Sequence, residues 1–293
     1  MIFKISFDIF DKYLNKTLNK NEGLMGDIGI LGGGWLGMAL AKEGINMGYK
    51  VRVSSTSKEK ANQLLAEGYS AYFLKISEIH SQGQLEFFKD LNTLVITIPP
   101  GLRKNPELNY VGLLDQVVKE IEYFKIQKVI FTSSTSVYGF QKGVITEESA
   151  LLGNNTSAQQ IIKVEQKLLE NDNFACGIVR LGGLMGPDRH PIFSLSGEKN
   201  LPNPNSPINF IHQIDAVNIL LKLIENFGEN KVFNGVSPFH PTRKDYYTQM
   251  AEIAELTAPT FEETGKIRGV VKAEKVVREL GCQYVVKNLL ILN

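Results

Sequence analysis

Short apolar segments alternate with amphipathic segments along most of this chain. We expect strands at residues 28–31, 50–54, 71–75, 93–98, 128–133 and 175–180, and helices at residues 35–47, 58–67, 106–124 and 157–170. Several of the strand segments are almost continuously apolar, which is typical of parallel strands buried on both faces. Regular alternation of strand and helix predicts an α/β fold with a Rossmann-type, doubly wound parallel sheet. Beyond residue 181 this alternation becomes less regular.

A glycine-rich turn follows the first predicted strand. Gly32, Gly34 and Gly37 fit the pattern G-x-G-x-x-G. In this pattern the first glycine permits a tight turn, the second admits a diphosphate, and the third packs the helix on the strand. The next helix begins at Trp35, followed by Leu36, and its N-terminus would present free backbone amides and a partial positive charge to the diphosphate. With a strand before it and a helix after it, the turn predicts a dinucleotide site, although a glycine turn without a ligand has the same local pattern.

The end of the second strand distinguishes NAD from NADP in a unit of this type. An Asp or Glu about twenty residues after the glycines binds the ribose 2′-hydroxyl of NAD. Ser54 occupies the position twenty residues after Gly34. The following residues carry hydroxyls and lysines, which suit a 2′-phosphate, so we expect NADP to be preferred over NAD. The predicted contacts are Ser54, Ser55, Thr56 and Lys58. Ser57 is also well placed to cap the next helix.

Two more loops follow strands at the same predicted edge of the sheet. Pro99 and Pro100 form a proline turn along the expected cofactor groove, where a turn alone would also explain them. The strand at residues 128–133 leads into consecutive hydroxyl residues that begin with Thr132 and Ser133. A Ser/Thr cluster at a strand end commonly forms a capped loop. At the carboxyl edge of a doubly wound sheet, however, it faces the ligand.

Four blocks resemble the extended short-chain dehydrogenases/reductases, the superfamily of nucleotide-sugar epimerases and dehydratases. They are F-T-S-S-T-S-V-Y-G at residues 131–139, R-L-G-G-L-M-G-P at 180–187, N-F-I-H-Q-I-D-A-V at 209–217 and E-L-G at 279–281. With G-W-L-G-M and G-P-x-R-H-P, they look like an atypical branch of bacterial NAD(P)-dependent epimerases/dehydratases. The resemblance implies a Rossmann domain at residues 25–181 and a smaller, interleaved C-terminal substrate lobe at residues 182–293.

The resemblance also implies roles for single residues. Ser134 stands at the place of the family's catalytic Ser/Thr, four residues before Tyr138, and Asn109 resembles an asparagine of the long helix beneath the nicotinamide. The turn after the sixth strand, where the family places substrate contacts, contains Arg189 and His190. An arginine there can bind a carboxylate or phosphate through two hydrogen bonds, so we expect an anionic substrate such as a nucleotide sugar.

Other polar residues are candidates by position alone. Tyr138 and His212 are considered as catalytic groups, and His240 as a substrate contact. A single histidine is more commonly a structural residue with satisfied hydrogen bonds. Asp215 and Thr242 are expected to cap the helices that follow them.

The chain departs from the family pattern in two places. Leu31 stands where the extended family usually has the first glycine of its turn. The predicted helix at 157–170 contains no tyrosine, so the usual Tyr-x-x-x-Lys pair is missing. One alignment places Gln159 and Lys163 at these positions. The alignment that we prefer places Ser157 and Ile161 there, because Glu165 then matches a family glutamate. A serine hydroxyl is much less acidic than a phenol, so we predict that the usual proton relay is absent.

Composition limits the classes of function. The 293 residues are 43% hydrophobic and 22% charged, with a net charge of +1, which gives no reason to expect a nucleic acid or an anionic membrane as partner. The two cysteines, Cys176 and Cys282, show no metal-binding spacing and indicate a reducing, cytoplasmic compartment. Residues 1–24 lack a secretory cleavage site, and either Met25 is the natural start or they form an accessory helix.

We expect an NAD(P)-dependent oxidoreductase or epimerase-like enzyme, with a non-catalytic dinucleotide-binding redox sensor as the alternative.

Overall fold

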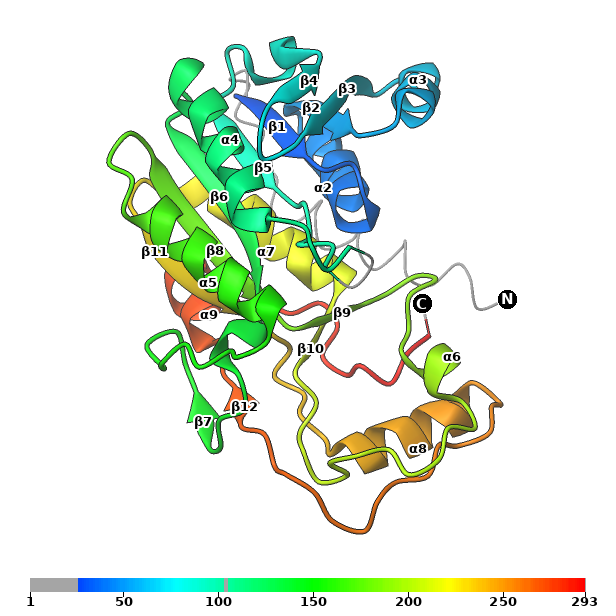
Figure 1. Cartoon of the computed structure of the whole chain (residues 1–293). Coiled ribbons are helices and arrows are strands. Elements are labelled where there is room, and N and C mark those ends of the chain that lie inside the picture. The colour runs from blue at the N-terminus through cyan, green and yellow to red at the C-terminus, as the bar shows by residue number, and fades with distance from the viewer. Residues whose placement is uncertain (1–25, 103–104, 293) are drawn as a thin grey trace.

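An eight-stranded sheet forms the centre of the computed structural model, which describes residues 26–102 and 105–292 (Figure 1). The expectation for residues 1–24 lies outside this range. The strand order is β11-β8-β6-β5-β1-β2-β3-β4. The strands are β1 (Asp27–Leu31), β2 (Lys50–Ser55), β3 (Ser70–Ile76), β4 (Ser81–Gly83), β5 (Thr93–Ile96), β6 (Lys128–Ser134), β8 (Ala175–Leu181) and β11 (Lys231–Gly235). All pair in parallel except β3 with β4, which confirms the predicted fold class.

The order of the strands locates the region in which a ligand would bind. The chain builds β1, β2 and β3 toward one edge, then returns to place β5 on the other side of β1. Ile28 of β1 is therefore in register with both Val51 and Thr93. In doubly wound sheets the crevice at such a switch point, outside the carboxyl ends of the strands, binds ligands. Here the switch point lies after Leu31 and Ile96.

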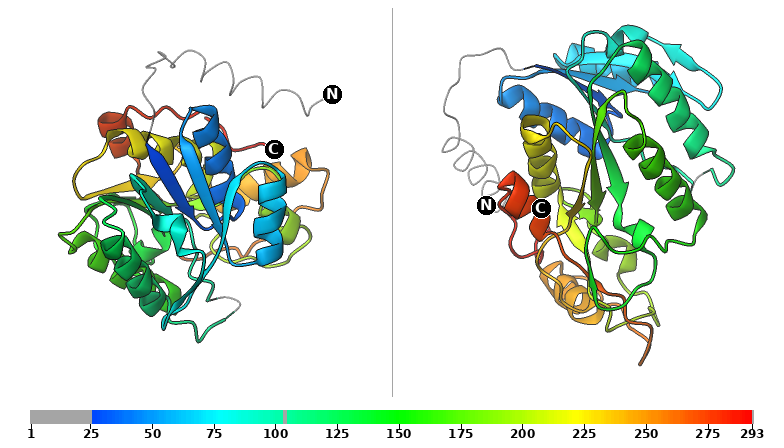
Figure 2. Two further views of the ribbon diagram at one scale, coloured as in Figure 1. Left: turned by 90° about the horizontal axis from the view of Figure 1, so that it is seen from above. Right: turned by 90° about the vertical axis from the view of Figure 1, so that its left-hand side faces the viewer.

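Helices cover both faces of the sheet (Figure 2). The helix α2 (Trp35–Asn46) packs beside α7 (Gln213–Asn226) on one face, and α4 (Tyr110–Tyr123) packs beside α5 (Thr156–Leu169) on the other. The central strands are consequently buried on both sides, and Ile30, Val95 and Ile130 are wholly inaccessible to solvent. The remaining helices are α3 (Lys58–Ala66), α6 (Ile192–Leu195), α8 (Arg243–Ile253) and α9 (Glu274–Leu280), with short 3-10 turns η1 (Leu85–Phe88) and η2 (Thr135–Tyr138).

Residues after Leu181 contribute to the main sheet and also build a second, smaller cluster. They supply β11 and α7, as well as β9 (Gly183–Met185), β10 (Phe210–His212) and β12 (Val270–Val271), the last of which pairs with β7 (Val144–Ile145). The second apolar cluster is formed by Met185, Ile192, Ile208, Tyr246, Tyr247, Met250, Ala251 and Leu289. It holds α6 and α8 together below the carboxyl edge of the sheet (Figure 1).

Five of the described α-helices begin with a side chain that caps their free amides. Ser57, Asn109, Asn155 and Thr242 each accept a hydrogen bond from the backbone N–H three residues later, which confirms the predictions for Ser57 and Thr242. The prediction for Asp215 is wrong, because α7 begins earlier, at Gln213, and is capped by the His212 side chain. Asp215 lies inside the first turn of α7. It is buried and accepts hydrogen bonds from the amides of Val285 and Val286.

Candidate dinucleotide and substrate site

The glycine turn lies at the switch point, and its backbone is shaped for close approach. Gly32 has a φ of +116°, a value that favours glycine. A Cβ on Gly37 would come within 2.2 Å of the Gly32 carbonyl oxygen, so only glycine lets α2 pack this closely. At Gly34, by contrast, nothing lies within 4 Å of where a Cβ would stand. Gly34 is also the N-cap of α2, and no side chain caps this helix. The N-terminus of α2 therefore has no capping side chain and has open space beside Gly34, which fits a diphosphate group.

Ser54, at the end of β2, supports this turn from behind. Its Oγ accepts a 3.0 Å hydrogen bond from the Gly32 amide, and its side chain is buried. Ser55 is also buried, and its Oγ accepts a bond from the Ser57 amide, whereas Thr56 is exposed. Of the residues expected to bind a 2′-phosphate, Ser54 and Ser55 thus have roles within the loop.

The lysine at the glycine turn is one that the sequence analysis did not select. Lys60 Nζ donates a 2.6 Å hydrogen bond to the carbonyl oxygen of Gly33. The expected Lys58 instead places its Nζ 5.2 Å from the centre of the Phe73 ring. Because both residues lie in the first turn of α3, no sequence signal distinguished them. The direction of each side chain decides which cation lies beside the turn.

The proline turn after β5 is anchored by two hydroxyl groups. Thr97 Oγ1 donates a 2.7 Å bond to the Gly32 carbonyl oxygen, and Tyr110 OH donates a 2.8 Å bond to that of Ile98. Tyr110 is buried, and burial raises the pKa of its phenol, so its proton stays in this bond. Pro99 is exposed and Pro100 half-buried beside the glycine turn. Asn109 caps α4 through its side chain, and so has a structural role at the start of this helix.

The hydroxyl run after β6 is divided between buried and half-buried positions. Ser133 is buried and donates a hydrogen bond to Glu165 Oε1. Ser134 is half-buried, and its Oγ accepts a 3.1 Å bond from the Ser136 amide at the start of η2. Since that contact uses a lone pair of the Ser134 hydroxyl, its proton is free to be donated. Ser134 therefore keeps a hydroxyl proton that it could donate to a ligand.

Tyr138 belongs to a buried polar network and is inaccessible to solvent. Its hydroxyl donates to Asn234 Oδ1 at 2.7 Å and accepts from Arg180 Nη1 at 2.9 Å. Arg180 in turn pairs with Glu165 at 2.7 Å. Burial raises the pKa of Tyr138, with a partly opposing effect of the Arg180 charge. A buried phenol with both hydrogen-bonding functions occupied cannot transfer a proton to a substrate unless the network opens.

The histidines also have structural partners. Nδ1 of His212 accepts from the Ile214 amide, and the side chain is 1% exposed. Nδ1 of His190 accepts from the Ile192 amide, while its Nε2 lies 2.8 Å from Tyr246 OH. Burial lowers the pKa of His190 to about 4, so the ring is neutral and donates through Nε2. His240 Nδ1 lies 2.9 Å from the Ile208 carbonyl oxygen, and its pKa is also lowered by burial. The His190 and His240 contacts join these residues to Tyr246 and Ile208 of the second cluster, and the His212 contact caps α7.

Arg268 is a cation near the hydroxyl run that the sequence analysis missed. It lies just before β12, and its Nη2 donates a 3.2 Å bond to the Thr135 carbonyl oxygen. Its Nε is buried and has no hydrogen-bond partner among the described residues. Burial lowers its pKa from the usual arginine value. Arg268 is half-buried, and a buried N–H without a partner is costly, which makes its guanidinium a candidate anion contact near the Thr135 carbonyl.

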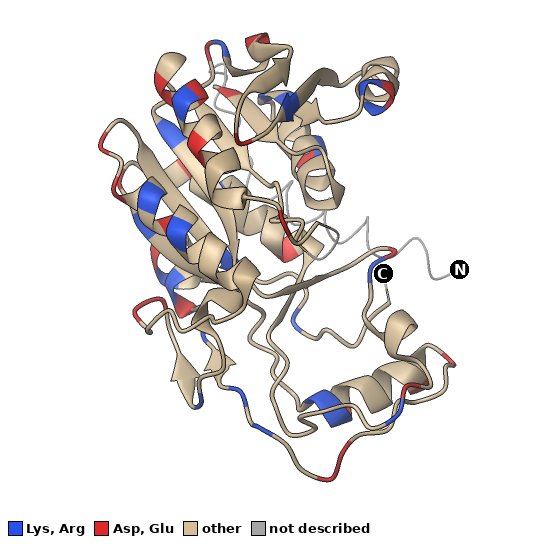
Figure 3. Cartoon of the chain, viewed as in Figure 1, with Lys and Arg blue, Asp and Glu red and all other residues tan. Residues whose placement is uncertain are grey.

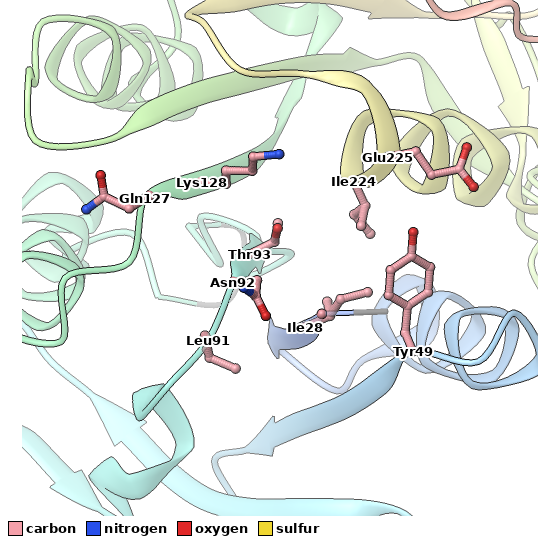
Figure 4. Close-up of a pocket in the computed structure, with 10 residues that line it drawn as sticks. Ile28, Tyr49, Leu91, Asn92, Thr93, Gln127, Lys128, Ile224 and Glu225 are labelled. Carbon is pink, nitrogen blue, oxygen red and sulfur yellow. The ribbon is translucent and has the colours of Figure 1, made fainter. Parts of the chain in front are cut away.

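A cavity in the described part of the chain lies at the opposite edge of the sheet. It has a volume of about 510 Å³ and is lined by residues that include Tyr49, Thr93, Lys128 and Glu225, at the amino ends of the strands (Figure 4). It is remote from the glycine turn, and ligands of doubly wound sheets bind at the other edge, at the carboxyl ends of the strands.

No group of three or more His, Cys, Asp or Glu residues in the described ranges could hold a metal ion. Lys and Arg positions are interspersed with Asp and Glu positions along the helices in Figure 3, and none of the described helices could cross a membrane.

Known proteins resemble both the first part of the chain and its whole length. The family model described as "NADP oxidoreductase coenzyme F420-dependent" matches residues 27–104, which include the glycine turn and the end of β2. The protein YeeZ of Escherichia coli K12 is 29% identical over 265 residues, which cover 89% of this chain and 96% of YeeZ.

Solved structures show the same fold at low sequence identity. MoeE5, solved with UDP-glucuronic acid and NAD, superposes with a TM-score of 0.72 at 18% identity over 88% of this chain and 94% of MoeE5. The UDP-N-acetylglucosamine 4-epimerase of Bacillus cereus gives a TM-score of 0.71 at 13% identity, again over 88% of this chain and 94% of the other. The resemblance to nucleotide-sugar epimerases is thus confirmed as a likeness of fold, and the comparisons support a dinucleotide as the ligand of the Rossmann unit.

Proposed function

We propose that this protein is an NADP(H)-binding oxidoreductase or epimerase-like enzyme that acts on a small anionic substrate, such as a nucleotide sugar. The observation that carries the proposal is the uncapped N-terminus of α2 behind Gly34, at the switch point of the sheet. Its geometry fits the diphosphate of a dinucleotide, and the match of residues 27–104 to NADP oxidoreductases supports this ligand.

The preference for NADP over NAD rests on the residues after β2. No carboxylate stands at Ser54, where NAD-binding units carry an Asp or Glu. The Lys60 ammonium lies against the Gly33 carbonyl, beside the expected position of the adenosine ribose. Lys60 would supply a cation for a 2′-phosphate there, whereas no carboxylate would accept a hydrogen bond from a 2′-hydroxyl.

Ser134 is the proposed hydrogen-bond donor to the substrate oxygen, and Arg268 the proposed contact for a substrate anion. A bound nicotinamide would supply or accept the hydride. The helix α5 carries no tyrosine, and Ile161 on its buried face is 4% exposed. Without a Tyr-Lys pair, proton transfer would depend on Ser134 and on solvent, so we expect slow turnover compared with enzymes that have a phenolic acid.

One observation favours a second candidate, a non-catalytic redox sensor. Tyr110, Tyr138 and His212 all have structural partners. The two functions are separated by NADPH oxidation assays with ketones, aldehydes and nucleotide sugars. An enzyme gives turnover that Ser134→Ala lowers about a hundredfold, the usual scale of acid–base catalysis, while leaving NADPH affinity intact. Binding of NADPH with no turnover on any substrate would favour the sensor, and failure to bind either dinucleotide would refute both functions.

A further inference from the structure

The turn Gly186–Arg189 connects the second cluster to the Rossmann unit. The amide and carbonyl groups of Gly186 and Arg189 form two hydrogen bonds with each other, of 3.1 and 3.0 Å. The turn is therefore a closed loop of four residues, with Asp188 at a φ of 58°. The next residue, His190, fixes it to Tyr246 of α8. A turn that is held in this way has few conformations to lose when it binds a ligand.

On its other side the turn rests on Trp35. The indole Nε1 donates a 3.2 Å hydrogen bond to the Pro187 carbonyl oxygen. The guanidinium carbon of Arg189 lies 5.0 Å from the centre of the Trp35 ring, a cation–π distance. Gly186 also packs on the ring, since a Cβ there would lie 3.2 Å from an indole carbon. Gln213 completes the contact by donating a 2.9 Å bond to the Trp35 carbonyl oxygen.

Trp35 is also the first residue of α2, directly after Gly34. The contact with its ring therefore holds the Arg189 cation at the same end of α2 as the uncapped amides. Arg189 is exposed, and no carboxylate in residues 26–102 or 105–292 lies within ion-pair distance of it. Stacking uses the face of a guanidinium and leaves its N–H edge available, and that edge matches two phosphate oxygens.

We propose that Arg189 binds the diphosphate of the dinucleotide, and that the turn Gly186–Arg189 is a strap across the cofactor. This assignment rests on the proposed function and replaces the expectation from the sequence that Arg189 contacts the substrate. It has a specific consequence, because the diphosphate is common to NADP and NAD. Arg189 should strengthen the binding of both dinucleotides to the same degree and should not influence the choice between them.

Calorimetric titration of the full chain with NADPH, NADH and adenosine tests the proposal. Arg189→Gln is expected to weaken NADPH and NADH binding equally, by about tenfold, the scale of one charge-assisted hydrogen bond, and to leave the weaker binding of adenosine unchanged. Lys199→Gln is the matched control, since it removes one exposed positive charge from the same part of the chain without touching Trp35. This control should bind all three ligands like the wild-type protein.

Tryptophan fluorescence provides an independent measurement, because Trp35 is the only tryptophan in the chain. Its emission should change when NADPH or ADP binds to the wild-type protein, and this change should be reduced in Arg189→Gln. If the wild-type protein binds NADPH and Arg189→Gln binds it equally well, the proposal is overturned while the proposed function stands. If Arg189→Gln has normal cofactor affinity but a raised KM for the substrate, Arg189 contacts the substrate and the proposal is likewise overturned. If the wild-type protein binds no dinucleotide, the proposed function fails and this proposal fails with it.

Discussion

Glu165 and Arg180 form an ion pair in the interior of the molecule, with 2.7 Å between Oε2 and Nη2 and side chains that are only 1% and 5% exposed. Glu165 comes from α5 and Arg180 from β8, so the pair joins a helix to the sheet that it covers. The same two residues bind the hydroxyls of Ser133 and Tyr138. The pair therefore fixes the segment on which Ser134 lies.

Breaking this pair from one side should be costly. Glu165→Ala leaves the Arg180 charge buried without its partner, and we expect the free energy of unfolding to fall by about 3–5 kcal/mol. The exposed pair of Lys167 and Asp115 is a matched control from the same helix, and Lys167→Ala should cost less than about 1 kcal/mol. Urea unfolding followed by circular dichroism measures both. Equal, small losses in the two variants would contradict the structural role assigned to Glu165.

Lys60 should determine the choice between NADP and NAD. Lys60→Met removes the ammonium beside the Gly33 carbonyl, and we expect NADPH binding to weaken about tenfold, with NADH binding nearly unchanged. Lys58→Met is the control, since Lys58 lies over Phe73 and should affect neither cofactor. Calorimetry with both cofactors distinguishes the outcomes. An equal loss of NADPH and NADH affinity in Lys60→Met would show that Lys60 only supports the turn.

Asp215 should make the stability of the fold depend on pH. Burial raises the pKa of its carboxyl to about 7 in the folded chain, against a partly opposing effect of the Val285 and Val286 amides. A raised carboxyl pKa favours the protonated form in the folded state, so this contribution to stability is complete below pH 4 and is lost as pH rises to about 7.

Comparison with Asp215→Asn isolates this effect. Between pH 4 and 7 the stability of the wild-type protein should fall relative to the variant, by an amount on the order of 4 kcal/mol. Denaturant titrations at several pH values measure the difference. Parallel pH profiles of the two proteins would show that Asp215 has an ordinary pKa in the folded chain.

Much of the sheet could be predicted because its physical signal is local. The strands β1, β5, β6 and β8 are largely apolar and buried, and the helices α3, α4 and α5 begin with a polar cap, so the ends of most of the predicted strands and helices lie within a residue or two of those observed. The predicted helix at 106–124 began too early, because residues 105–109 form turns before Tyr110. The strands β7, β9, β10 and β12 contain two or three residues, too few to show any periodicity.

The candidate site was less predictable, because it depends on where side chains point. The sequence placed the glycine turn correctly in the chain, since its pattern is local. It could not show that Lys60 rather than Lys58 turns toward Gly33, or that Arg180 and Asn234 occupy the Tyr138 hydroxyl. Arg268 and Thr135 are 133 positions apart in sequence, so only the fold brings them together. Contacts of this kind carry no signal in a single sequence.

The most direct test of the account is the affinity of Gly34→Val for NADPH. Gly34 has a φ of −84°, which valine can adopt, and nothing lies within 4 Å of the position of its Cβ. The variant should therefore fold, with an unchanged circular dichroism spectrum, as should the control Gly228→Val at another open glycine. Because the valine side chain would stand where the diphosphate must approach the amides of α2, calorimetry should show NADPH binding weakened by roughly a hundredfold or more in Gly34→Val. The control should bind like the wild-type protein. A folded Gly34→Val that binds NADPH with the affinity of the wild-type protein would contradict the central claim that this turn is the dinucleotide site.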